Sequence, residues 1–146
     1  ENPYLIEFNV RMGDPECQTI LPLLENDLSE IFFDCCVGKL SEKKIKLSNK
    51  KSICIVLCSK GYPEDYKKDS EISKLNKLSL KDNEYIYHAG TKLKDNKILN
   101  SGGRVLNFVS TSNNLKESRD DLIKLIKRLD WENGFFRKDI AYKVID

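Results

Sequence analysis

Hydrophobic and polar positions alternate one by one along residues 6–11, in a run that begins at Tyr4 and is rich in aromatic and β-branched side chains. Side chains of a β-strand point alternately to its two faces, so this alternation predicts a strand with one apolar and one polar face. The apolar face, which is expected to enter a core, carries Ile6, Phe8 and Val10. The polar face carries Glu7, Asn9 and Arg11. A Gly-Asp-Pro corner at residues 13–15 should end the strand.

Three segments have the spacing and the end signals of helices. Asp14 precedes a proline and has the form of an N-cap for a short helix over residues 15–21. A second helix is predicted over residues 27–37, with a glycine directly after it as terminator. A third helix should follow Asn114, because Glu117 completes a pattern that resembles a capping box. The apolar stripe of this third helix consists of Leu115, Leu122, Ile126 and Leu129.

A second structural unit should begin with the near-continuous apolar run at residues 52–58, which has the length of a buried strand. The polar, lysine-rich stretch before it reads as a connection. Asp95 and Asn96 have the form of a two-residue hairpin turn, which favours antiparallel pairing of the segments on either side. Further strands are expected at residues 84–88, 91–93, 98–99 and 104–110. The predicted class is therefore α+β, with a small antiparallel sheet and packed helices.

Composition narrows the function classes. Lysine and asparagine are abundant, but acidic residues nearly balance the basic ones and the net charge is only +2. Nucleic-acid binding normally needs a clustered positive excess, whereas these basic residues are dispersed, so no nucleic-acid partner is expected. No apolar run approaches the ~20 residues that cross a bilayer, so no membrane partner is expected and the chain reads as soluble.

The cysteines indicate a cytoplasmic protein. There are five, at positions 17, 35, 36, 54 and 58, with no Cys-x-x-Cys pair among them. An odd number argues against a complete disulfide framework, and the single histidine, His88, lies far from all of them in sequence, so zinc has little support. Buried, reduced thiols are the simplest interpretation.

The polar face of the first predicted strand carries candidate chemistry. A carboxylate at Glu7 and an amide oxygen at Asn9 form a pair of hard oxygen donors that suits Mg²⁺. The alternative is that both residues line the hydrated face of a half-exposed strand. The helix start beside this strand favours anions, and the alternative there is that Asp14 simply caps the helix.

Residues 7–18 closely resemble the signature region of the phosphoribosylamine-glycine ligase family, also called glycinamide ribonucleotide synthetases, within the ATP-grasp superfamily. Met12 stands where an aromatic residue is more usual in that signature. Further blocks resemble the same family in the same order: KGYP at 60–63, HAGT at 88–91, GGRVL at 102–106 and GFFRKDI at 134–140. Ordered blocks over nearly the whole chain are more specific than one motif.

The resemblance implies a C-terminal portion of such a ligase. Residues 1–40 would end the ATP-grasp catalytic domain, residues 41–50 would be a linker, and residues 51–146 would form the α+β domain that closes over substrate. The implied reaction joins glycine to phosphoribosylamine through a glycyl phosphate, in de novo purine biosynthesis. ATP would be the co-substrate, with Mg²⁺ or Mn²⁺ as the metal ion. The first residues include no initiator Met, so an upstream part of the same polypeptide is expected to be missing.

The resemblance also implies roles for single residues. Glu7 and Asn9 would be metal ligands, and Arg11 would act catalytically by steering a phosphate or carboxylate. Substrate binding would fall to Asp14 and to three cations that are candidates for the ribose phosphate: Arg104, Arg137 and Lys138. The alternative is that these cations pair with local acids such as Asp139. His88 reads as a hydrogen-bonded structural histidine before it reads as an acid or base.

A competing hypothesis is a stand-alone, non-catalytic binding module derived from the C-terminal region of the ligase. No glycine-rich phosphate-covering loop is found, so the chain by itself is expected to bind ATP weakly and to catalyse nothing. The upstream coding sequence would discriminate the two hypotheses.

Overall fold

The computed structural model describes residues 2–145, and its centre is a four-stranded antiparallel sheet with the order β2-β5-β1-β6. The strands are β1 (Lys51–Ser59), β2 (Glu84–His88), β5 (Arg104–Ser112) and β6 (Gly134–Phe135). A separate hairpin consists of β3 (Thr91–Lys94) and β4 (Lys97–Asn100). The helices are α1 (Glu16–Ile20), α2 (Leu28–Cys36), α3 (Leu115–Leu129) and α4 (Tyr142–Ile145), with short 3-10 turns at Leu21–Leu23, Leu40–Glu42 and Leu75–Lys77. The predicted α+β class with an antiparallel sheet is confirmed.

The hydrophobic core lies between the sheet and α3. Every second side chain of β1 is buried on this face, at Ile53, Ile55 and Leu57. Leu106 and Phe108 of β5 lie opposite Leu57 and Ile55 and are fully buried. The stripe of α3 that meets them consists of Leu122, Leu125, Ile126 and Leu129. Burying such aliphatic side chains contributes about 1.5–3 kcal/mol each, so this layer is the main source of stability.

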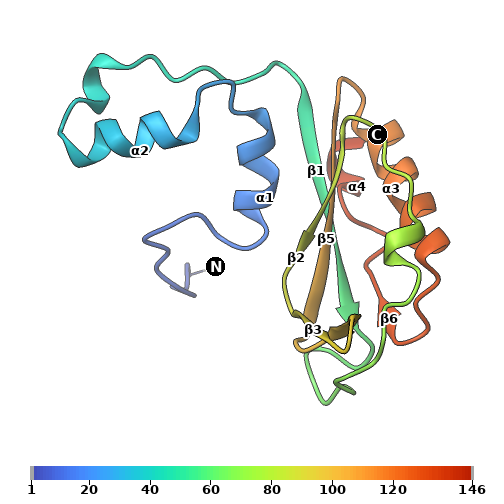
Figure 1. Cartoon of the computed structure of the whole chain (residues 1–146). Helices are drawn as coiled ribbons and strands as arrows, with labels where there is room; N and C mark the ends of the chain where they lie inside the picture. Colours follow the sequence, from blue (N-terminus) through green and yellow to red (C-terminus); the bar gives the residue numbers. More distant parts are fainter. Residues whose placement is uncertain (1, 146) are drawn as a thin grey trace.

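The opposite face of the sheet is covered in part by α1 (Figure 1). Cys54, Val56 and Cys58 point to this side of β1 and are only half-buried. The sequence predicts that the run at 52–58 is buried on both faces. Helix α1, with only five residues, is too short to cover the second face completely. Figure 1 shows α1 and α2 on one side of the sheet and α3 on the other.

Most of the predicted helix and strand positions are confirmed within a residue or two. Asp27 caps α2 by accepting from the backbone amides of Ser29 and Glu30, and Gly38 follows the helix with a positive φ of 72°. Asn114 caps α3 in the same way, and the loop at Asp95 forms the expected β3–β4 hairpin turn. These ends depend on local side-chain bonds and backbone angles, which short sequence patterns encode.

The strand expected at residues 4–10 is wrong: the segment has no regular secondary structure. Its apolar side chains do not enter a core, since Ile6, Phe8 and Val10 are 92%, 84% and 98% exposed. A strand needs a neighbour to receive its backbone hydrogen bonds, and within residues 2–145 none pairs with this segment. Asp14 is not an N-cap either, because Pro15 takes that position and no side chain caps α1.

The five cysteines are free thiols, as expected, but the prediction that they are buried is wrong. Cys35 and Cys36 at the end of α2 are exposed, and the remaining three are half-buried. None of the helices described within residues 2–145 is long and apolar enough to cross a membrane.

Candidate functional site

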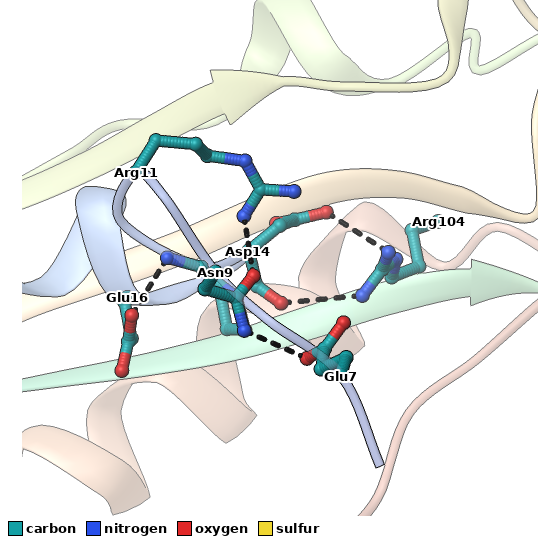
Figure 2. A pocket seen from close by; sticks show the side chains of 8 residues that line it. Glu7, Asn9, Arg11, Asp14, Glu16 and Arg104 are labelled. Carbon is teal, nitrogen blue, oxygen red and sulfur yellow. Dashed lines mark hydrogen bonds and ion pairs between the residues drawn. The ribbon is translucent and has the colours of Figure 1, made fainter. Parts of the chain in front are cut away.

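A cavity of about 400 Å³ lies between the N-terminal segment, the start of α1 and the first residue of β5. Figure 2 shows the labelled side chains converging on it from these three elements. Charged and amide side chains dominate its lining, together with Gly13 and Pro15: Glu7, Asn9, Arg11, Asp14, Glu16 and Arg104. Five of the seven residues that the sequence nominates as site residues are therefore brought together.

The side chains of Glu7, Asn9 and Arg11 form a chain of hydrogen bonds along one side of the N-terminal segment. Asn9 Nδ2 donates to Glu7 Oε1 at 2.9 Å, and Arg11 Nη1 donates to Asn9 Oδ1 at 3.1 Å. Arg11 Nη1 also donates to the carbonyl of Met12 at 2.9 Å. The prediction that these three side chains lie on one side of the chain is confirmed, although the segment is not a strand.

Arg104 joins the sheet to the corner before α1. Its Nη2 lies 3.3 Å from Asp14 Oδ2, and its Nη1 donates to the Asp14 carbonyl at 3.2 Å. The second carboxylate oxygen of Asp14 accepts from Gln18 Nε2 at 2.9 Å. Asp14 therefore binds α1 and β5 at the same time, which is a different role from the expected helix cap.

A β-bulge explains why Arg104 faces α1. Leu57 pairs with Leu106, but the next residue, Cys58, pairs with Arg104, so β5 has one extra residue, Val105. Without the bulge, strict alternation would place Arg104 opposite Ser59, on the α3 side. The extra residue returns Arg104 to the α1 side, which is the re-aiming that bulges beside functional sites commonly provide.

Two glycines in the turns beside the start of β5, Gly90 and Gly103, allow close packing around Arg104. A Cβ atom on Gly103 would lie 2.1 Å from the ring of Tyr62. A Cβ atom on Gly90, which lies against Gly102, would lie 2.6 Å from the carbonyl oxygen of Arg104. Both turns therefore need glycine for close backbone approach rather than for ligand contact.

The donor chemistry of the cavity fits a hard divalent cation held by few protein ligands. The Glu7 carboxylate and Asn9 Oδ1 lie on the same side of the segment and are linked through the Asn9 amide. Among residues 2–145 there is no cluster of three or more His, Cys, Asp or Glu side chains that could hold a metal ion. Mg²⁺ commonly accepts one or two protein ligands and completes its shell with water and substrate phosphates, so two donors suffice for it.

The thiols beneath α1 are held in their neutral form. Burial raises the pKa of Cys54 to about 12, and the Asp14 carboxylate contributes in the same direction. Burial also raises the pKa of Cys58, where Arg104 opposes and Asp14 supports the shift. Because only the thiolate is a strong nucleophile, these cysteines act as packing residues.

Arg137 and Lys138 do not line this cavity. Arg137 donates to Asp139 twice, from Nε at 3.1 Å and from Nη2 at 2.8 Å, and this pairing raises the pKa of Arg137. The carbonyl of Lys138 accepts from Arg119 on α3. His88 is hydrogen-bonded, with Nδ1 2.8 Å from Thr91 Oγ1. Arg137 therefore forms the ion pair with Asp139 that was the alternative to a role in phosphate binding.

Two residues of the site were missed by the sequence reasoning. Glu16 lines the cavity and accepts from the Gly13 amide at 2.6 Å, and Gln18 holds Asp14. The signal was the spacing: residues three and four apart across a helix start lie close enough for such bonds.

The comparisons with known proteins agree on one family. The family described as Phosphoribosylglycinamide synthetase, C domain, matches residues 52–143. The phosphoribosylamine-glycine ligase of Caldanaerobacter subterraneus subsp. tengcongensis is 44% identical over 97% of this chain and 33% of its own length. That of Brucella melitensis is 37% identical over 100% of this chain and 34% of its own length.

A solved structure is similar as well. The crystal structure of phosphoribosylamine-glycine ligase from Thermotoga maritima has a TM-score of 0.69 and 30% identity, and the match covers 96% of this chain and 34% of that one. This chain spans about a third of the length of the relatives that it matches. Because the family match extends over more than half of the residues, the chain belongs to the phosphoribosylglycinamide synthetase C-domain family.

Proposed function

We propose that this chain is the C-terminal part of a phosphoribosylamine-glycine ligase of the ATP-grasp superfamily. Such an enzyme joins glycine to phosphoribosylamine at the expense of ATP, through a glycyl phosphate, in purine biosynthesis. The proposal is supported by the family match and by relatives that carry this name. An upstream part of the same polypeptide would supply the rest of the ATP site, and the whole enzyme would be cytoplasmic.

The observation that carries the proposal is the convergence of charged side chains from distant parts of the chain on one cavity. Arg104 lies 90 residues from Asp14 in sequence, yet it pairs with both the carboxylate and the carbonyl of that residue. Arg11 and Glu7 reach the same cavity from the other side. A site of this kind presents both charge signs to a ligand, as the binding of a metal, a phosphate and a carboxylate requires.

Glu7 and Asn9 are the proposed metal ligands, for Mg²⁺ or Mn²⁺. The ion, when bound, offsets negative charge on phosphate oxygens during phosphoryl transfer. Both donor oxygens already lie on one side of the segment because Asn9 bonds to Glu7 and to Arg11. Arg11 would steer a phosphate or carboxylate with a guanidinium that the Met12 carbonyl holds in place.

Asp14 and Arg104 are proposed to bind substrate beside the metal ligands. The Arg104 guanidinium has five donor hydrogens, of which its contacts with Asp14 use only part, so it retains capacity for an anion. Arg137 and Lys138 are also proposed for the ribose phosphate. For Arg137, a phosphate would have to compete with the Asp139 carboxylate that now accepts its two hydrogen bonds.

The same proposal assigns a domain role to each part of the chain. Residues 1–40 would complete the ATP-grasp domain, residues 41–50 would link, and residues 51–146 would close over the acceptor substrate. All residues of the buried core fall in the third part, between Ile53 and Leu129. This distribution supports a boundary before β1.

Replacing Glu7 in the full-length ligase tests the proposal. Glu7→Gln keeps the size of the side chain but removes its charge, so a metal held by Glu7 and Asn9 should bind more weakly. We expect kcat for glycinamide ribonucleotide formation to fall at least about a hundredfold, as for loss of one electrostatic group of a transition-state site. Magnesium-dependent nucleotide binding should weaken in the same variant.

Glu132→Gln is the matched control, since Glu132 is exposed and does not line the cavity. It should leave kcat within about twofold, as expected for a surface substitution. Unchanged kinetics in Glu7→Gln would remove Glu7 from the site. A full-length protein without ligase activity would favour a binding module instead.

A further inference from the structure

Asn107 is a buried amide in the middle of the sheet. It lies at the centre of β5, is 1% exposed, and neither its Nδ2 nor its Oδ1 has a hydrogen-bond partner among the described residues. Its neighbour along the strand on the same face, Val109, is fully buried and apolar. An amide that is buried without partners is costly, and such exceptions in native proteins call for a specific explanation.

The register of the sheet shows which way Asn107 faces. Its partners are Val56 on β1 and Tyr87 on β2, and Val56 belongs to the half-buried row that α1 covers. Cys54 and Cys58 lie on either side of Val56 in that row. Helix α1, which carries Gln18, contacts both β1 and β5 on this side of the sheet.

Gln18 offers a complementary polar group on the same side. Its Nε2 donates to Asp14 Oδ1 at 2.9 Å, whereas its Oε1 is buried and has no partner among the described residues. Gln18 Oε1 is an acceptor, and the Asn107 amide offers one donor and one acceptor group. No direct hydrogen bond joins these groups among the described residues, but one water molecule that donates twice and accepts once would satisfy all three of them.

We propose that Asn107 is a positioning residue that holds Gln18, and through it the Asp14–Arg104 pair, through a single bridging water molecule. The resulting chain of polar contacts leads from Asn107 in the middle of β5 through Gln18 and Asp14 to Arg104 at the start of β5. It gives the guanidinium of Arg104 a defined position without Asn107 touching a ligand. The role of this Arg104 position in substrate binding rests on the proposed function. The contact between Asn107 and Gln18 is independent of that function.

A double-mutant cycle on the 146-residue chain tests the contact. Asn107→Leu and Gln18→Met each remove one polar group at nearly constant volume and leave the other unpaired. Each should lower the folded-to-unfolded ratio about tenfold, measured by urea unfolding. The double variant should also lose about tenfold, because removing both partners leaves no unpaired group.

Ser52→Ala combined with Gln18→Met is the matched control cycle. Ser52 Oγ lies on the same side of β1 and is another buried atom with no partner among the described residues. Ser52 is four residues from Val56, however, which is about 13 Å along a strand. This pair should be additive. A loss of about a hundredfold in the Asn107→Leu/Gln18→Met variant would show two independent sites and would overturn the proposal.

A spectroscopic measurement separates positioning from simple packing. The Nε–H resonance of Arg104 reports on its pairing with Asp14, so Asn107→Leu and Gln18→Met should shift it in the same direction in a ¹H–¹⁵N spectrum. Asn107→Ser keeps a donor, an acceptor and room for one water molecule, and should restore the resonance. An Arg104 resonance that neither variant moves contradicts the proposal, even if stability falls. Neither measurement uses ligase activity, so failure here and failure of the proposed function are distinct.

Discussion

At the scale of single residues, Arg104 has the central structural role in the candidate site. Its side chain connects the sheet to the segment before α1 through two contacts with Asp14. Both side chains are partly exposed, so the ion pair itself adds little to stability. Its value is geometric, because it sets how the Glu7–Asn9–Arg11 side of the N-terminal segment faces β5.

The raised pKa of Cys54 leads to a prediction about reactivity. With a pKa of about 12, only about one Cys54 in 10⁴ is a thiolate at pH 8. Exposed Cys35 and Cys36 should therefore be alkylated by iodoacetamide in minutes at pH 8, while Cys54 remains unmodified. Peptide mass spectrometry after a timed quench measures this. Labelling of Cys54 at the rate of Cys35 would mean that α1 does not cover it in solution.

Some residue-level features could be predicted and others could not. The alternation in the sequence correctly placed Glu7, Asn9 and Arg11 on one side, where hydrogen bonds between residues two apart join their side chains. The position of Arg104 could not follow from alternation, since a bulge changes the count by one residue. Only the family resemblance selected Arg104 as a candidate.

At the scale of elements, a buried polar network ties the end of β1 to the loop at 67–70 and the turn at Gly102. Asn100 is fully buried: its Nδ2 donates to Ser59 Oγ at 2.9 Å and to the Lys67 carbonyl at 2.7 Å. Its Oδ1 accepts from the Ser70 amide at 2.7 Å. Ser59 Oγ in turn donates to the Gly102 carbonyl at 2.8 Å, two residues before Arg104. The network therefore supports the strand that carries the site.

Removing the hub of this network should destabilise the chain strongly. Asn100→Ala leaves the Ser70 amide and the Lys67 carbonyl without their partner, which should lower the free energy of unfolding by about 3 kcal/mol. Urea unfolding followed by circular dichroism measures the loss. Asn76→Ala, at an exposed position, is the control and should change the value by less than about 0.5 kcal/mol. Equal effects would argue that the network is not a unit.

Some helices and strands are specified by sequence signals within the segment itself, whereas others depend on contacts with distant parts of the chain. β1, β5, α3 and the β3–β4 hairpin were predictable because their caps, turns and apolar periods lie within each segment. Residues 4–10 have a strand pattern but no strand, because pairing requires a neighbour from outside the segment. α2 has the amphipathic pattern of a packed helix, yet Phe32 and Phe33 are 60% and 66% exposed. Its pattern specifies a helix but not what covers it.

At the scale of the whole molecule, stability is concentrated in one part of the chain. Every residue of the buried core lies between Ile53 and Leu129, and α2 has no buried residue. The N-terminal part is joined to the sheet mainly through α1 and the Arg104–Asp14 contacts. Local opening should therefore cost much less free energy before residue 50 than after it.

Hydrogen exchange should reveal this gradient directly. Backbone amides of residues 4–12 and of α2 should exchange within seconds to minutes, whereas those of β1, β5 and the middle of α3 should be protected for hours. Mass spectrometry of peptic peptides at pH 7 gives the comparison within one sample. Protection of α2 equal to that of β1 would contradict an independent second unit beginning near residue 51.

The exposed segment at residues 4–10 also affects how the chain behaves at high concentration. Seven residues with strong β-propensity and no proline are the kind of segment that pairs between molecules when its edges are free. Glu7 carries the only charge in that run, so the proposed metal ligand also acts as a gatekeeper against self-association. Neutralising Glu7 in the 146-residue chain therefore favours intermolecular β-pairing, which light scattering over a concentration series would detect.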